Sequence, residues 1–234
     1  MDYAAFIMEV VSAIVCAILV WFMIKPYRVT GENRYLGLPL GFAFLSMSYV
    51  LLASTFYFES FRFLGEVTWL QLFTQTYAYS FLAATYFFSN KPSKYSRLWW
   101  NLTYAMIALV AVISYLVIIE PLIFSLGLPS YDKANQYLLV FNIVCLAYIS
   151  IHTLRSHALK PDPKTIWIPL SYLLIGFGQY SLLIWAIDSS LTAYFGAQFL
   201  RLIGLLVLLF VSYQTFYSAQ ELHKEGSNYE EDSP

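Results

Sequence analysis

Five polar side chains interrupt otherwise apolar stretches of this sequence, and they are the residues that could bind or react: Glu9, Gln75, Asn142, Gln179 and Arg201. Arg201 is the most informative, because an arginine deep in lipid costs about 3 kcal/mol on insertion scales and normally faces the interior of a helix bundle with a partner. Glu9 is the only acid at a matching depth. Together these groups predict a site for a small anionic or amphipathic molecule, held by charge and hydrogen bonds.

All five residues lie at similar distances from the same end of the apolar segments that carry them. From the helical rise, Glu9 lies about 8 Å deep, Asn142 about 10 Å, Gln75 and Gln179 about 12 Å, and Arg201 about 12 to 15 Å. Helical spacing also gives four of the segments an inward polar stripe. The stripes are Glu9, Ser12 and Cys16; Gln71, Gln75 and Tyr79; Asn135, Asn142 and Cys145; and Tyr194, Gln198, Arg201, Leu205 and Ser212.

This polar layer has three interpretations. In a closed ring of seven helices the first and last are neighbours, so Glu9 and Arg201 could form a structural ion pair, with the amides joining helices by hydrogen bonds. The same layer could line a ligand pocket that opens to the outside. It could also be part of an ion or proton pathway.

The elements that must position these residues are seven apolar segments: 4–24, 36–58, 67–89, 98–119, 134–153, 165–187 and 191–217. Each is long enough, as a helix, to cross a hydrocarbon layer of about 30 Å. Backbone groups have no water partner in lipid, so continuous helices are expected. The composition agrees, with 59% hydrophobic and only 12% charged residues. The sequence therefore predicts an all-α membrane protein, with residues 1–217 forming one seven-transmembrane-helix bundle in the lipid bilayer.

Glycines that recur on single segments predict where helices approach closely, because small residues let two backbones come near each other in membranes. Gly37 and Gly41 form one such pair. Gly176 and Gly178 form another, and Gly196 and Gly204 lie on the last segment.

The basic residues predict the orientation of the bundle. The first, third and fifth connections together contain nine Lys and Arg residues, whereas the other three connections contain only Arg62 and Lys133. By the positive-inside rule the nine face the cytoplasm, which puts the N-terminus outside and the C-terminus inside, and we expect the plasma membrane. The nine are Lys25, Arg28 and Arg34; Lys91, Lys94 and Arg97; and Arg155, Lys160 and Lys164.

The segment 218–234 is polar and acidic, and it is expected to be a short cytoplasmic tail that is disordered after its first turn. It is too short for an output domain of on the order of 100 residues. Any signal would therefore leave through a separate cytoplasmic partner or membrane complex.

Several kinds of chemistry have no residues to carry them. The last segment has no lysine for a retinal Schiff base, and His152 and His157 lie together at one end of a segment rather than as a pair across a haem. Zinc and serine protease motifs are missing. We expect no enzyme activity, no cofactor, no metal and no nucleic acid partner.

In topology, residues 4–217 resemble seven-helix receptors and the seven-helix sensory modules found ahead of prokaryotic signalling domains. The positions of the rhodopsin-like signatures read Phe88-Ser89-Asn90 and Val211-Ser212-Tyr213, so no ligand residue is carried over. The resemblance implies a sensor or receptor-like module whose outer pocket binds a small molecule. A small-solute transporter or channel, and an accessory packing subunit of a larger membrane complex, remain as alternatives.

Overall fold

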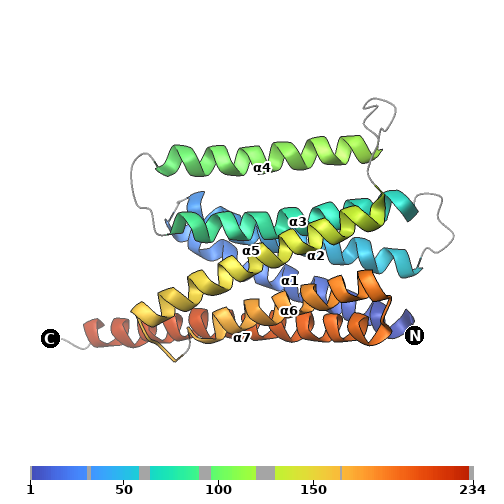
Figure 1. The fold of residues 1–234 in the computed structure, drawn as a ribbon. Coiled ribbons are helices and arrows are strands. Elements are labelled where there is room, and N and C mark those ends of the chain that lie inside the picture. The colour runs from blue at the N-terminus through green and yellow to red at the C-terminus, as the bar shows by residue number, and fades with distance from the viewer. Residues whose placement is uncertain are drawn as a thin grey trace.

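The computed structural model describes residues 2–30, 33–57, 64–89, 96–119, 130–163 and 165–231, and over these ranges the chain is helical apart from its connections. Arg62, Asn90, Lys91, Lys94, Lys164 and Asp232 lie outside the described residues. Successive α-helices run in opposite directions along the bundle (Figure 1). They are α1 (Asp2–Thr30), η1 (Asn33–Leu36, a short 3₁₀ helix), α2 (Gly37–Tyr57), α3 (Leu64–Ser89), α4 (Ser96–Ile119), α5 (Tyr131–Leu159), α6 (Trp167–Asp188) and α7 (Leu191–Glu231).

Within the described residues, six of the seven α-helices are long and apolar enough to cross a membrane by length and composition. These six are α1, α2, α4, α5, α6 and α7. The helical membrane-protein class expected from the sequence is therefore confirmed. The exception is α3, which carries the polar residues Gln71, Thr74 and Gln75 close together in its first half.

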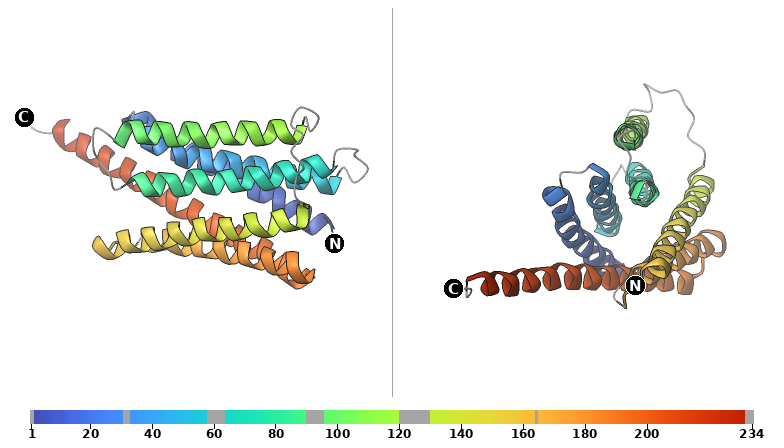
Figure 2. Two further views of the ribbon diagram at one scale, coloured as in Figure 1. Left: turned by 45° about the horizontal axis from the view of Figure 1, so that its top comes forward. Right: turned by 90° about the vertical axis from the view of Figure 1, so that its left-hand side faces the viewer.

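The ring of helices contains six members rather than the expected seven. Packing runs from α1 to α2, α3, α5, α6 and α7 and returns to α1, so the first and last helices are neighbours as expected. Helix α4 packs against α3 and η1 and lies outside this ring (Figure 2). The expectation that all seven helices would close one ring is therefore wrong. Helix α4 follows α3 in the sequence, and a helix can pack against its sequence neighbour from outside the ring as well as within it.

The peripheral position of α4 explains the composition of α3. Helix α3 is covered by α2, α5 and α4, so it needs little apolar surface of its own. Its outward polar groups are bonded to α4 instead: Thr74 Oγ1 to Tyr115 Oη at 2.9 Å, Tyr77 Oη to Ser114 Oγ at 2.6 Å, and Thr85 Oγ1 to Tyr104 Oη at 3.1 Å. Hydrogen bonds of this kind satisfy polar groups that would otherwise face hydrocarbon.

The predicted glycine contacts divide into two groups. A methyl group added at Gly178 would meet the backbone of α7, and one added at Gly204 would lie 2.8 Å from the Ser171 carbonyl oxygen of α6. A methyl group at Gly37 would overlap the side chains of Thr85 of α3 and Tyr104 of α4, and one at Gly41 would overlap Leu82 of α3. By contrast, a methyl group at Gly196 meets nothing within 4 Å, and one at Gly176 makes only an ordinary contact.

The connection between α6 and α7 is a turn at Ser189 and Ser190. Ser189 has a left-handed backbone with φ of 51°, and its N–H donates to the Trp185 carbonyl at 2.8 Å. The Tyr194 N–H then donates to the carbonyl of Ser190 at 3.1 Å and starts the next helix. So tight a turn forces α6 and α7 to lie side by side and antiparallel.

Helix α7 continues to Glu231, well past the expected end near residue 217. The part of the tail expected to be disordered is thus helical as far as Glu231. Residues 219–225 read Ala-Gln-Glu-Leu-His-Lys-Glu, which are mostly good helix formers, and no proline occurs in α7. The end of α7 projects beyond the other helices (Figure 2).

Candidate ligand-binding site

A buried ion pair joins the first helix of the ring to the last. Arg201 Nη2 of α7 lies 2.7 Å from Glu9 Oε2 of α1, and the two side chains are 2% and 0% exposed. This is the pairing predicted from their matching depths. A buried charge that keeps its partner avoids the large cost of an isolated ion.

Two further groups hold the Arg201 guanidinium. Its Nη2 also donates to Gln198 Oε1, one turn earlier on α7. On another side its Cζ lies 4.3 Å from the centroid of the Tyr49 ring of α2, in the geometry of a cation–π contact. Helices α1, α2 and α7 therefore meet at this one side chain.

The four predicted polar stripes face the interior. Every stripe residue is buried except Asn135 and Tyr194, which are half-buried. Hydrogen bonds join the α3 stripe to two other helices: Gln179 Nε2 of α6 donates to Tyr79 Oη of α3 at 3.2 Å. Gln71 Nε2 of α3 donates to Gln75 Oε1 and to Ser48 Oγ of α2, both at 3.3 Å.

A cavity of about 410 Å³ opens among α2, α3, α5, α6 and α7. Its lining comes from the last turns of α2 and α6 and from the first part of α3, α5 and α7, so it lies in the half of the bundle that contains the N-terminus. Arg201 and Gln75 contribute to its wall. The lining residues are Leu52, Thr55, Phe56, Thr68, Gln71, Leu72, Gln75, Tyr131, Asn135, Leu139, Leu182, Trp185, Leu191, Tyr194, Gln198 and Arg201.

The five predicted site residues occupy two kinds of position. Gln75 and Arg201 line the cavity. Glu9, Asn142 and Gln179 are fully buried and do not belong to its lining. Glu9 forms an ion pair with Arg201, which itself lines the cavity. Neither amide atom of Asn142 is hydrogen-bonded to any residue that the structure describes.

Three of the residues that line the cavity also carry buried N–H groups without a hydrogen-bond partner among the described residues. Arg201 Nε, Gln198 Nε2 and Gln75 Nε2 are all buried and have no hydrogen-bond partner among the described residues. Buried donors in native proteins are nearly always satisfied. Buried acceptors without a partner among the described residues occur in the same layer, namely Glu9 Oε1, Gln179 Oε1 and Asn142 Oδ1.

Two contributors to the site were not expected from the sequence. Tyr49 lies in a segment that is apolar on all sides, so its spacing gave no sign that it faces Arg201. Trp185, near the end of its apolar segment, lines the cavity next to Tyr194, with ring centroids 5.2 Å apart. A tryptophan near the end of an apolar segment fits an interfacial belt as well as a binding site, and sequence alone does not separate the two roles.

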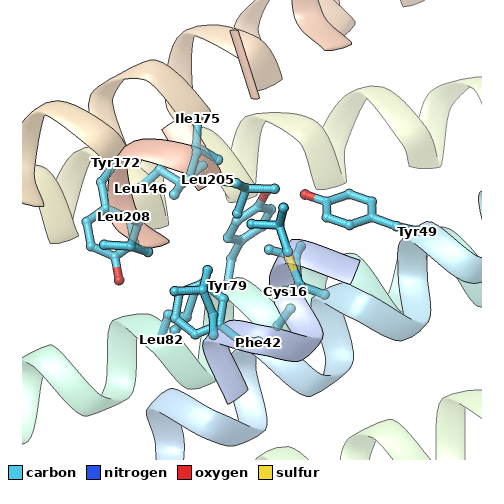
Figure 3. Packing of buried hydrophobic residues seen from close by; sticks show 14 of the residues in the cluster. Cys16, Phe42, Tyr49, Tyr79, Leu82, Leu146, Tyr172, Ile175, Leu205 and Leu208 are labelled. Atoms are coloured by element: carbon cyan, nitrogen blue, oxygen red, sulfur yellow. The ribbon is translucent and has the colours of Figure 1, made fainter. Parts of the chain in front are cut away.

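A layer of large apolar side chains fills the bundle directly beyond the polar layer. Leu82, Leu146, Ile175 and Leu205 each lie one turn beyond a polar stripe residue or Gln179, and each is at most 1% exposed (Figure 3). On the far side of this layer the Tyr86 hydroxyl donates to the Tyr172 hydroxyl at 3.2 Å. Apolar packing thus separates the polar layer that contains the ion pair from polar groups nearer the other end.

The site therefore combines a mostly apolar cavity with a few polar lining residues, one of which is the ion-paired Arg201, and this combination is typical of small-molecule sites. Known protein families, curated proteins and solved structures were all compared with the chain, and none of them matches it.

Proposed function

We propose that the chain crosses the plasma membrane seven times, with its N-terminus outside and its C-terminus in the cytoplasm. Six helices have the length and composition of membrane spans. Helix α3 lies among three of them, α2, α4 and α5, and the hydroxyl groups of Thr74, Tyr77 and Thr85 on its outer side are bonded to α4. Lys25, Arg28, Arg155 and Lys160 lie at the ends of α1 and α5 that are opposite the cavity. By the positive-inside rule this end is cytoplasmic, and the cavity then faces outward.

We further propose that this protein is a sensor or receptor-like module that binds a small amphipathic molecule in the cavity. The observation that carries the proposal is a cavity of about 410 Å³ whose lining includes the polar side chains of Gln75, Gln198 and Arg201. Its volume lies within the range of about 300 to 1,000 Å³ that is usual for small-molecule sites. Leucines and aromatic residues make up most of the remaining wall.

Helix α7 gives the binding site a direct route to the cytoplasm. It carries Arg201 and Gln198 at the cavity and continues without a break to Glu231. The distance along the helix from Arg201 to Glu231 is about 45 Å. A shift of Arg201 on ligand binding would move the projecting end, where a separate cytoplasmic partner can bind.

The packing beyond the cavity favours binding over passage. A channel or an open transporter needs a polar path through the bundle. Here Leu82, Leu146, Ile175 and Leu205 fill that space. A transporter would have to separate these side chains during its cycle, whereas a sensor needs only a small helix movement.

Binding can be tested by filling the cavity. Wild-type protein and the variant Thr55→Phe are purified from membranes, and the small molecules extracted from each are quantified by mass spectrometry. We expect one amphipathic molecule at close to one per wild-type chain and much less in Thr55→Phe, because Thr55 lines the cavity. The matched control is Thr192→Phe, an exposed residue of α7 outside the cavity lining, which should retain the molecule. Equal amounts in all three proteins would contradict the proposed site.

Signalling can be tested with spin labels at Ser156 of α5 and Thr215 of α7, both exposed near the proposed cytoplasmic end. We expect the distance between the labels to change when the extracted molecule is added back, and to stay constant in the Thr55→Phe background. Accumulation of the same molecule inside sealed vesicles, without a change in this distance, would identify a transporter instead.

A further inference from the structure

We infer that the molecule bound in the cavity is an amphipathic amine, whose protonated nitrogen lies at the mouth of the cavity against Thr55 and Thr68 and whose apolar body extends toward Arg201. The mouth is the end of the cavity next to the turn at Ser189 and Ser190, where α2 and α6 end and α3, α5 and α7 begin. This inference rests on the proposed binding function and narrows its ligand class. It keeps the amphipathic character expected from the sequence and assigns the head group a positive charge.

Two hydroxyl groups at the mouth can act only as hydrogen-bond acceptors toward a ligand. Thr55 Oγ1 donates to the Leu52 carbonyl oxygen, and Thr68 Oγ1 donates to the Gly65 carbonyl oxygen, both at 2.7 Å. A hydroxyl group has one hydrogen and two lone pairs, so each threonine keeps its lone pairs for the ligand. Both residues line the cavity and are only half-buried, which leaves them accessible surface. A head group with N–H donors fits this wall.

Aromatic rings from four helices surround the same end of the cavity. The ring centroids of Trp185 and Tyr194 lie 5.2 Å apart, and Trp69 packs edge-on against Tyr131 with centroids 5.4 Å apart. The lining rings are half-buried or exposed, so a ligand can reach them. Aromatic faces attract ammonium groups, which adds to the attraction of the threonine oxygens. The aromatic residues of the lining are Phe56, Tyr131, Trp185 and Tyr194.

The charges around the mouth favour a cation over an anion. Glu66, Asp132 and Asp188 each lie within three residues of a lining residue, and Lys133 offsets one of these charges. Net negative charge at an opening raises the local concentration of cations. An anionic head would meet acceptors and negative charge at the mouth. Deeper in the cavity it would meet the Arg201 guanidinium, which already has its carboxylate partner at 2.7 Å.

The deeper part of the cavity fits the apolar body of the ligand. Four leucines, one each from α2, α3, α5 and α6, line it: Leu52, Leu72, Leu139 and Leu182. The glutamines and the arginine beside them are at most 9% exposed, so the surface that a ligand contacts there is mainly carbon. An apolar chain gains free energy by leaving water for this space. An ammonium group at the same depth would lose its water, whereas at the mouth it stays close to solvent.

The test uses probes that share an octyl-length chain and differ in the head: octylamine, 2-octanone and octanoate. Octylamine is protonated at neutral pH, 2-octanone is uncharged and only accepts hydrogen bonds, and octanoate is an anion. The protein is held in nanodiscs of a zwitterionic lipid and titrated with each tritiated probe, and binding to empty nanodiscs is subtracted. We expect octylamine to bind about tenfold more tightly than 2-octanone, as one charged hydrogen bond or a cation–π contact would give, and octanoate to bind most weakly.

Two substitutions locate the head group. Thr55→Val removes an acceptor oxygen with little change of shape, and Trp185→Leu removes one ring. Each should weaken octylamine binding by about threefold to tenfold and change 2-octanone binding by less than about twofold. The matched controls are Thr192→Val and Trp167→Leu, which replace exposed residues outside the cavity lining and should change neither.

The molecule extracted from wild-type protein and lost from Thr55→Phe should itself contain a basic nitrogen, which its exact mass and fragmentation reveal. The inference is overturned if 2-octanone or octanoate binds as tightly as octylamine, or if Thr55→Val and Trp185→Leu both keep full octylamine affinity. An extracted molecule without a basic nitrogen would show that the ligand class is wrong while the binding function stands. If extraction recovers no such molecule and no probe binds, both fail.

Discussion

Gly178 of α6 lies directly against Arg201 of α7: a methyl group added at Gly178 would be 3.3 Å from the Arg201 backbone nitrogen and 3.0 Å from the Ala197 carbonyl oxygen. These distances are shorter than an ordinary contact, so a methyl group at Gly178 would require the two helices to move apart by a few tenths of an ångström. Helix α6 therefore fixes the position of the Arg201 backbone through Gly178, and Glu9 of α1 binds the Arg201 guanidinium.

The first prediction follows from this contact. Gly178→Ala should force α6 and α7 apart and lower the free energy of unfolding by about 1 to 3 kcal/mol, as overpacking does. Gly196→Ala, on α7 with open space around it, is the matched control and should be neutral or stabilising by about 0.5 to 1 kcal/mol. Unfolding of the purified protein, followed by circular dichroism, measures both. Equal effects of the two changes would show that the α6–α7 contact is loose.

The second prediction concerns the ion pair. Glu9→Gln and Arg201→Gln each leave one buried charge without its partner, which typically costs about 3 to 5 kcal/mol. The double variant removes both charges and should be destabilised by less than the sum of the single changes. A double-mutant cycle on the same unfolding assay gives the coupling. Simple additivity would mean that the two residues do not act as a pair.

The third prediction distinguishes the contribution of the Tyr49 ring to stability from that of its hydroxyl group. Tyr49→Phe keeps the aromatic face 4.3 Å from Arg201 and should have little effect. Tyr49→Leu removes that face and should destabilise the protein by about 2 kcal/mol or more, since the cation–π contact is shielded from water. A comparable loss in both variants would instead assign the stabilisation to the hydroxyl.

The fourth prediction tests the orientation of the protein in the membrane by labelling residues at the two ends of α5. Ser130 precedes α5 and Lys160 follows it, and both are exposed. In intact cells, Ser130→Cys should react with an impermeant maleimide, and Lys160→Cys should react only after the membrane is opened. Cys16 and Cys145 are buried and should give little background. Labelling of Lys160→Cys alone in intact cells would reverse the proposed topology.

The sequence alone predicted the helices, their number within the described residues and the burial of the polar stripes. Spans must be long and apolar, and a charge in lipid is so costly that Glu9 and Arg201 at one depth predict their own pairing. The inward direction of the four polar stripes could be predicted for the same reason, because a polar residue in an apolar helix indicates the side that packs against other helices and not against lipid. The acidic composition of the tail predicts a shorter α7 than the structure shows, because residues 219–225 are mostly good helix formers.

Only the tertiary structure decided which helices are neighbours and which apolar residues contribute to the site. Helix α4 could have belonged to the ring, because lipid and a protein core both accept its leucines and valines, and the sequence does not distinguish the two environments. For the same reason Tyr49 gave no sign of facing Arg201, and Gly178 could not be told from Gly196. In a soluble protein the contrast between core and water marks the buried face, whereas in a membrane this contrast vanishes and close packing alone selects the partners.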